Sequence, residues 1–336
     1  MTSKELAKML GVSQSTVSRA LNGSTRISEE RRKEILAMAE KIGFELNLNA
    51  KNLRTQSSNF IGIVMPTYFR SLIADDFRAL QFNFLYAGLS KFDFDPVLLN
   101  NDEISDDASA LERAVKKRQL SGLILSRRIE KDNVIEYLKS LSIPLFSMTR
   151  CNEKMQFIPS VSSDSYEMGR LVGEHFAKGG HKHVAFVRIK NHQSGNLTAQ
   201  GFKDALEKGG VSFSQEDTFY TSFDFQSGYS AITENLDRIK KYDAIFAQND
   251  TMALGVLSAL RDQGISVPDD IAVAGNNDIP TAQWFSPRLT TIRTFVEVQS
   301  QMACDRIVSL IRTGKDPCSE KHYVVKPELI IRESCP

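Results

Sequence analysis

The sequence predicts an α/β fold with a small N-terminal helix-turn-helix headpiece, followed by two subdomains that are each a parallel β-sheet built from βαβ units. Two observations predict this. Residues 1–45 carry apolar residues at helical spacing, and from Phe60 onward apolar strands alternate with amphipathic helices in two successive series. Such alternation is typical of parallel sheets. A chain of 336 residues is also long enough for two or three separate cores.

The composition is that of a globular protein, with 41% hydrophobic and 25% charged residues. The formal net charge of +1 hides an asymmetry. Residues 1–58 contain ten Lys or Arg and six Asp or Glu, a charge of +4, whereas the remaining 32 basic and 35 acidic residues sum to −3. A basic head on a slightly acidic body indicates a nucleic-acid-binding module attached to a body with another task.

The sequence contains no apolar run long enough to span a bilayer and no secretory signal pattern at its start. None of the four cysteines shows metal-ligand spacing: Cys151, Cys304, Cys318 and Cys335. His181 and His183 lie close together in the sequence but lack a third ligand. We therefore expect a cytoplasmic protein with no membrane contact, no metal and no cofactor.

The first helix of the headpiece begins with Thr2-x-x-Glu5, which has the spacing of a capping box. It continues as a short amphipathic segment through Leu10. Gly11 stands where this helix must end and turn, a position that favours a residue tolerating positive φ.

A second helix follows Ser13, whose hydroxyl is a good N-cap. Val17 and Leu21 lie four residues apart and form an apolar stripe. The opposite face carries short hydrogen-bonding side chains and one guanidinium: Gln14, Ser15, Thr16, Ser18, Arg19 and Asn22. An ordinary bundle helix is the alternative, but this face lacks the Glu/Lys pairing of a merely solvated helix. We interpret it as a DNA-reading helix.

A third helix follows Ser28 and ends at Gly43, with Ile35 and Met38 in its apolar stripe. The next segment, 46–59, is polar and only weakly helical by propensity. It is predicted to be a hinge linker containing one short basic helix that orders on contact with a partner.

The body, 60–336, contains the two alternating series. The first has strands at 60–66, 95–100, 122–126 and 144–148 and helices at 72–92, 107–118 and 134–141. After a crossover near 157–164, the second has helices at 166–178, 198–208, 228–240 and 252–263 and strands at 183–187, 244–248 and 271–275. A strand at 289–293, a helix at 296–311 and a strand at 322–326 complete it. Ligands of such sheets bind at the carboxyl ends of the strands, so a cleft between the subdomains is the expected site.

Two specific runs carry a family resemblance: L-A-K-M-L-G-V-S-Q-S-T-V-S-R-A-L-N-G from Leu6 and V-P-D-D-I-A-V-A-G from Val267. Five further runs support it: N-x-x-A-K-x-L from Asn47, F-I-G-I-V-M-P from Phe60, H-K-H-V-A-F from His181, A-I-F-A-Q-N-D-T-M-A-L-G from Ala244 and S-P-R-L-T-T-I-R from Ser286. With them the sequence resembles the lactose-repressor/galactose-repressor family of bacterial transcription regulators over nearly its whole length. The resemblance implies subdomains of the periplasmic-binding-protein-like type. It also implies a homodimer that binds double-stranded DNA at a palindromic operator, with a small-molecule effector changing its affinity.

The resemblance assigns DNA-binding residues. Base-reading positions of the family match Gln14, Ser15 and Arg19, and positions near phosphates match Ser13, Thr16, Ser18 and Asn22. In the linker, Asn49 joins the DNA-binding set, and Leu53 matches the leucine that wedges into the minor groove at the operator centre. Without the resemblance, a contact between linker and core would be the preferred interpretation of Leu53. Leu46 replaces the family's usual proline, so the hinge is expected to be less preorganised.

The resemblance also assigns effector positions. Phe223 matches an aromatic that stacks on the ligand, and Asn249 matches a polar contact, but Thr198 and Asn277 replace the arginine and aspartate that hold ring hydroxyls. Five arginines fall near predicted strand ends: Arg70, Arg127, Arg128, Arg150 and Arg188. We hypothesise a sugar or sugar-derivative effector, and an anionic one would be held by Arg70, Arg127, Arg150 or Arg188. Solvated loop arginines are the alternative.

Two other functions fit a two-lobed α/β body. A solute-binding sensor protein would share it, but would need neither the helix-turn-helix nor the basic head. An α/β enzyme would need a nucleophile or cofactor motif, and the sequence contains no G-x-S-x-G, Walker or G-x-G-x-x-G motif. We therefore predict a transcriptional repressor that is not an enzyme and has no catalytic residues. No apolar heptads follow Arg332, which favours a dimer over a tetramer.

Overall fold

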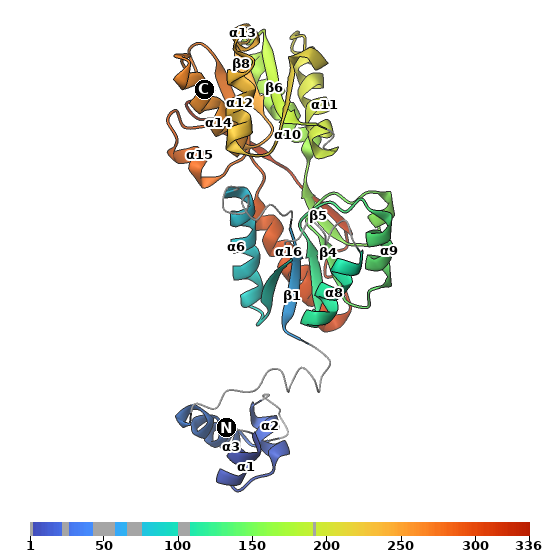
Figure 1. The fold of residues 1–336 in the computed structure, drawn as a ribbon. Helices are drawn as coiled ribbons and strands as arrows, with labels where there is room; N and C mark the ends of the chain where they lie inside the picture. The colour runs from blue at the N-terminus through green and yellow to red at the C-terminus, as the bar shows by residue number, and fades with distance from the viewer. Residues whose placement is uncertain (1–2, 22–26, 43–57, 66–75, 100–107, 191–192) are drawn as a thin grey trace. The chain divides into compact units, whose positions relative to one another are not determined.

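The computed structural model describes residues 3–21, 27–42, 58–65, 76–99, 108–190 and 193–336. The chain divides into two compact units, Met1–Ser58 and Asn59–Pro336 (Figure 1). The first unit is helical and the second contains both sheets. The predicted α/β fold class, with a helix-turn-helix and two sheets that are almost wholly parallel, is confirmed.

The N-terminal unit contains α1 Ser3–Met9, α2 Gln14–Leu21 and α3 Glu29–Lys41, as the sequence predicts. Gly11 adopts a φ of +62° and ends α1: its N–H donates to Lys8 O at 3.4 Å, and Val12 N donates to Ala7 O at 3.0 Å. These two bonds satisfy the last carbonyls of the helix. The three helices share a core in which the most buried side chains are Leu6, Val17 and Ile35.

The first lobe of the second unit contains a six-stranded sheet of parallel pairs, in the order β11-β5-β4-β3-β1-β2. Its strands are β1 Phe60–Val64, β2 Asp95–Leu99, β3 Gly122–Leu125, β4 Leu145–Ser147, β5 Ser160–Ser163 and β11 His322–Val325. Helices α6 Asp76–Ser90 and α16 Val296–Thr313 cover one face, and α8 Ala108–Arg118 and α9 Asp132–Ser140 cover the other (Figure 1). A short 3-10 helix, η1 Glu153–Met155, precedes β5.

The second lobe contains the sheet β12-β10-β9-β8-β6-β7. Its strands are β6 Val184–Ile189, β7 Thr218–Thr221, β8 Ala244–Ala247, β9 Ala272–Asn277, β10 Thr290–Arg293 and β12 Glu328–Ile330, the last antiparallel to β10. Its helices are α10 Ser165–Lys178, α11 Gln193–Lys208, α12 Phe225–Thr233, α13 Leu236–Ile239, α14 Asp250–Asp262 and α15 Pro280–Trp284, with the 3-10 turn η2 Gln215–Asp217. Helices α10 and α11 cover one face of the sheet, and α12 and α14 cover the other.

The chain passes between the lobes three times: from β5 to α10, from β10 to α16, and from β11 to β12. Hydrogen bonds join these passages. Ser163 Oγ donates to Thr294 O at 3.0 Å, and the buried Gln299 Nε2 donates to both Ser163 Oγ and Thr294 O, at 2.8 and 2.6 Å. Asp164 N donates to Val325 O at 3.2 Å. The three crossover segments between the lobes are therefore joined to one another by hydrogen bonds.

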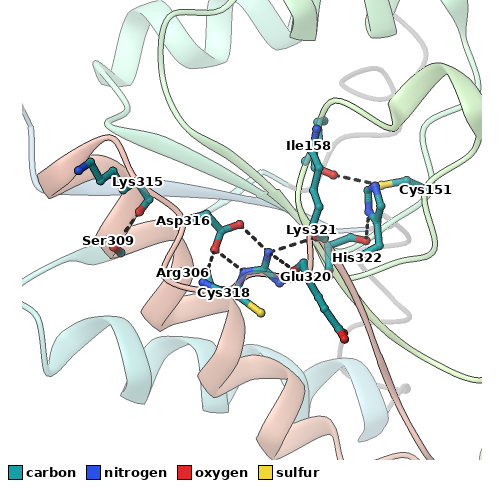
Figure 2. A network of polar contacts seen from close by, with 11 residues as sticks. Cys151, Ile158, Arg306, Ser309, Lys315, Asp316, Cys318, Glu320, Lys321 and His322 are labelled. Carbon is teal, nitrogen blue, oxygen red and sulfur yellow. Dashed lines mark hydrogen bonds and ion pairs between the residues drawn. The ribbon is translucent and has the colours of Figure 1, made fainter.

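A buried arginine supports the edge of the first sheet formed by β5 and β11, from which two of the crossover segments leave (Figure 2). Arg306 of α16 is 2% exposed, and its Nε donates to Asp316 Oδ1 at 2.9 Å. Its Nη groups donate to the backbone carbonyls of Ser160, Glu320 and Lys321 at 3.1–3.4 Å. The guanidinium thus supplies hydrogen bonds to backbone acceptors around β5 and β11.

Several elements differ from the prediction. The segment predicted as a bare crossover contains β5, whose sequence S-V-S-S has one apolar residue and therefore no strand pattern. The predicted helix 228–240 is two helices, α12 and α13, because the first ends at Thr233 and the second begins after Asn235. Strands β7 and β12 and helix α15 are not predicted from the sequence, because they are short and lack a clear period. Helix α11 begins five residues earlier than predicted, at Gln193.

Two helix pairs of the second lobe meet through glycines. A Cβ added to Gly169 of α10 would lie 1.9 Å from Thr198 O of α11, and one added to Gly201 would lie 2.0 Å from Tyr166 O. Gly228 and Gly255 meet the backbones of α14 and α12 in the same reciprocal way. At these glycines the two helix backbones of each pair lie too close together to leave room for a side chain.

A buried carboxylate holds the loop after β9. Asp250, the first residue of α14, is fully buried and accepts hydrogen bonds from Ile279 N at 2.9 Å and from Thr291 Oγ1. Burial raises the pKa of Asp250 to about 7, although both hydrogen bonds act to lower it. The loop from Asn277 onward is thereby anchored to α14.

Gly169→Ala is expected to destabilise the protein by about 3 kcal/mol, because α10 and α11 must separate to admit the methyl group. Gly179→Ala, at the end of the same helix, serves as control. Its added Cβ would have its nearest atoms at 3.3 Å, so its effect should stay below about 1 kcal/mol. Chemical unfolding followed by circular dichroism compares the two, and equal losses would contradict the close approach.

The stability contributed by Asp250 is expected to fall as the pH rises. Its pKa is about 7 in the folded protein against an ordinary value of 3.8, so the folded state holds the proton more tightly. This stabilisation is complete below about pH 4 and is lost as the pH rises through 7, with a slope of up to about 1.4 kcal/mol per pH unit. Urea unfolding of the wild type and Asp250→Asn across this window measures it. A pH-independent difference between the two proteins would refute it.

Candidate nucleic-acid interface and effector site

The start of α2 is fixed by its cap. Ser13 Oγ accepts a hydrogen bond from Thr16 N at 3.1 Å and lies 2.7 Å from Ser15 Oγ and 2.8 Å from Thr16 Oγ1. The Ser13 carbonyl accepts from Val17 N at 3.2 Å. The predicted N-cap is confirmed, and it defines the orientation in which α2 presents its polar face.

Helix α2 presents its predicted base-reading side chains away from the core. Val17 and Ala20 are 0% and 1% exposed and pack against α1 and α3. Gln14, Ser15 and Arg19 are exposed. Ser18 and Thr16 are half-buried between these two faces.

An arginine of α3 supports this arrangement. Arg31 Nη2 donates to Leu10 O at 3.3 Å, at the end of α1, while its Nη1 lies 2.5 Å from Glu34 Oε2. The turn between α1 and α2 is therefore tied to α3.

Four predicted site residues lie outside the described residues: Asn22, Asn49, Leu53 and Arg70. The same holds for Leu46 and for 43–57, the greater part of the predicted hinge.

Two predicted effector residues of the second lobe are brought together. Asn249 caps α14, since its Oδ1 accepts from Met252 N at 2.7 Å, and its Nδ2 donates to Phe223 O at 3.1 Å. The amide therefore positions the aromatic residue. Phe223 is 41% exposed, and the Arg78 guanidinium of α6 lies 6.0 Å from its ring centroid. Arg78 was not predicted, because it lies inside an amphipathic helix and not at a strand end.

The predicted arginines are separated by the fold. Arg127 follows β3 and is half-buried, and Arg150 lies beyond β4 and is exposed, both in the first lobe. Arg128 Nε lies 3.0 Å from Glu130 Oε1. Of the predicted arginines that the structure describes, Arg188 alone belongs to the second lobe, on β6, where it is 6% exposed.

Thr198 and Asn277 occupy different environments. Thr198 is buried within α11, and its carbonyl faces Gly169 of α10. Asn277, the last residue of β9, is half-buried and has a φ of +128°. It precedes Asp278, which forms an ion pair with Arg332. Thr198 therefore lies in a helix contact, and Asn277 lies at a strand end.

A pocket of about 520 Å³ lies between β7, α12 and α13. Its lining includes Tyr220, Asp224 and Arg238, but none of the predicted effector residues.

Within the ranges that the structure describes, no group of three or more His, Cys, Asp and Glu side chains could hold a metal ion. In the same part of the chain, no helix combines the length and apolar character needed to cross a membrane.

Comparison with known families matches both units of the chain. Residues 2–47 match the model of bacterial regulatory proteins of the lacI family, and residues 173–335 match the model of the periplasmic binding protein-like domain. The first match covers all three headpiece helices, and the second covers most of the second lobe together with α16 and β11.

Individual relatives extend these matches over the whole chain. The probable HTH-type transcriptional repressor ExuR of Bacillus subtilis (strain 168) is 30% identical over 341 residues, which cover 99% of this chain and 98% of the relative. The structure of the transcriptional regulator CelR–cellobiose complex covers 99% of both chains at 25% identity, with a TM-score of 0.74. The lac repressor dimer bound to operator and the anti-inducer ONPF, at 20% identity, shares the fold over 100% of this chain and 99% of its own, with a TM-score of 0.84. The chain therefore belongs to the lacI family of bacterial regulatory proteins.

Proposed function

We propose that the protein is a sequence-specific transcriptional repressor whose affinity for a palindromic DNA operator is controlled by a small molecule bound between its two lobes. One observation carries the proposal. In a chain of this family, a capped α2 buries Val17 and Ala20 and leaves Gln14, Ser15 and Arg19 exposed. The relative from Bacillus subtilis is named as a transcriptional repressor.

The exposed residues of α2 have the chemistry to read bases. Arg19 can form a bidentate pair with O6 and N7 of guanine, and Gln14 can do so with N6 and N7 of adenine. Each such pair contributes roughly 1–3 kcal/mol of discrimination. Ser13, Thr16 and Ser18, near the start of the helix, suit phosphate contacts. Arg19 and Gln14 are therefore proposed as the main base-reading residues.

Homodimerisation supports recognition of a palindrome, because two headpieces related by a two-fold axis read two half-sites. Exposed aromatic side chains are available for an interface: Phe84 and Tyr86 on α6, and Trp284, 79% exposed, on α15. These two helices adjoin, since Thr281 Oγ1 of α15 hydrogen-bonds to Asp76 Oδ2 of α6. We propose that this surface forms the dimer contact.

The effector is proposed to act by linkage. Two contacts join the lobes, the hydrogen bond between Thr281 and Asp76 and the approach of Arg78 to the ring of Phe223. We propose that such contacts change when the lobes change their arrangement. A ligand that binds one arrangement more tightly shifts the population toward it. If that arrangement also changes the geometry of the paired linkers, operator affinity changes by the same coupling free energy.

The alternatives are weaker. A solute-binding sensor without a DNA role would not explain a headpiece with a capped, base-reading helix. An α/β enzyme is not supported by the relatives and structural neighbours, which are transcriptional regulators. We therefore also propose that the protein is not an enzyme.

Selection of bound sites from random duplex DNA should yield an inverted-repeat consensus with a deformable central step. Arg19→Ala is expected to weaken binding to that consensus roughly 10- to 100-fold, which corresponds to the loss of one bidentate base contact. Gel-shift titration measures the affinity. Arg32→Ala, which removes an equal charge from the exposed side of α3, should lower affinity without relaxing the sequence preference. An asymmetric consensus would argue against two paired headpieces.

Trp284→Ala is expected to raise the dimer dissociation constant roughly 30-fold, because a buried interface tryptophan typically contributes 2 kcal/mol or more. Sedimentation velocity across a dilution series measures the constant. Tyr323→Ala removes a partly exposed aromatic from β11 and should leave it unchanged. A Trp284→Ala protein that dimerises like the wild type would exclude this surface.

A further inference from the structure

Four polar side chains form a row across adjacent strands at the carboxyl edge of the second sheet. Arg188 on β6 pairs with Tyr220 on β7. On the other side, the parallel register of β6, β8 and β9 continues to place Arg188 beside Gln248 and Gln248 beside Asn276. We name these four residues the carboxyl-edge row. Since side chains alternate along a strand, the row shares the face covered by α10 and α11.

The cation in this row has no anionic partner among the described residues. Arg188 is 6% exposed and stacks near the rings of Phe186 and Tyr220, at 5.7 and 6.0 Å. Its Nη2 donates to Asn196 Oδ1 of α11. Its Nε finds no acceptor, and no carboxylate forms an ion pair with it, among the residues that the structure describes. Burial accordingly lowers the pKa of Arg188 below its ordinary value.

The row also contains an unsatisfied acceptor. Asn276 is 8% exposed, and its Nδ2 donates to Gln248 O at 3.1 Å. Its Oδ1 is buried without a donor in the described part of the chain. A buried charged donor and a buried acceptor left in this state both cost folding free energy. They lie two strands apart, about 10 Å.

Two other predicted arginines, Arg128 and Arg150, do not share this environment. Arg150 is exposed, and Arg128 lies beside Glu130. For a guanidinium that is solvated or already paired with a carboxylate, the absence of a bound anion costs little free energy. The cation of the carboxyl-edge row is different, because its environment favours an incoming anion.

We propose that the effector is a small polyhydroxylated anion, whose carboxylate or phosphate accepts hydrogen bonds from Arg188 and whose hydroxyl donates to Asn276 Oδ1. The inference rests on the proposed function, since it names the class of ligand that the site between the lobes accepts. A guanidinium held by two aromatic rings presents its planar donors to such an oxyanion. A neutral sugar would satisfy Asn276 but would leave the buried cation without a counter-charge.

The test is isothermal titration of the full-length protein with four probes: glucuronate, gluconate, glucose 6-phosphate and glucose. At least one anionic probe should bind, and glucose should not. Comparison of the two sugar acids with the sugar phosphate shows whether the site accepts a carboxylate or a phosphate. Arg188→Gln should weaken the anionic probe roughly 10- to 100-fold. Arg261→Gln, an exposed arginine of α14 in the same lobe, should bind it like the wild type.

Two further variants separate binding from folding. Arg188→Lys keeps the charge but loses the planar fork, and it should weaken the anionic probe while the thermal unfolding of the ligand-free protein changes little. Asn276→Asp places a carboxylate in the row and should also weaken the anionic probe. Because it removes the donor to Gln248 O, its thermal unfolding is measured as well, to separate lost binding from lost stability. Glucose binding as tightly as the anions, or no Arg188-dependent binding by any anionic probe, overturns the inference. Gel shifts without ligand test the proposed DNA-binding function separately from the proposed anionic effector. If Arg188→Gln still binds the selected DNA, the regulator assignment stands whatever the probes show, and if the wild type binds no specific DNA, the regulator assignment itself fails.

Discussion

The organisation of the body depends on the hydrogen bonds that join its crossing segments. Gln299 Nε2 and Ser163 Oγ satisfy the carbonyl of Thr294, where the chain leaves the second sheet and enters α16. A buried carbonyl at such a crossing needs a donor, and here the donors come from the other passages and from α16 itself. The three passages between the lobes are therefore joined to one another by hydrogen bonds.

Much of the fold could be predicted from the sequence because its signals are local. Ser13 and Ser28 mark the starts of α2 and α3 through caps that involve only a few neighbouring residues. Apolar runs such as F-I-G-I-V mark the buried strands of both sheets. The face of α2 that carries Gln14 and Arg19 follows from helical spacing once Val17 is assigned to the core.

The remainder depends on contacts between distant residues. Strand β5 is recognisable only by its partners β4 and β11, since its own residues are mostly serine. The Asn249 side chain caps α14 and donates to the carbonyl of Phe223, a relation that strand-end spacing cannot show; its prediction as a ligand contact stays a prediction. Arg188 is distinguished from Arg128 and Arg150 by its burial, which depends on the packing of α11 and cannot be seen in the sequence.

The reciprocal glycines of the second lobe have an evolutionary consequence. Gly169 with Gly201 and Gly228 with Gly255 bring helix backbones into contact, so these helices cannot slide or accept bulk without loss of stability. The residues at the strand ends lie outside these helix–helix contacts. Ligand preference can therefore diverge among descendants of this chain by exchange of a few strand-end side chains, while the scaffold that transmits the signal is inherited unchanged.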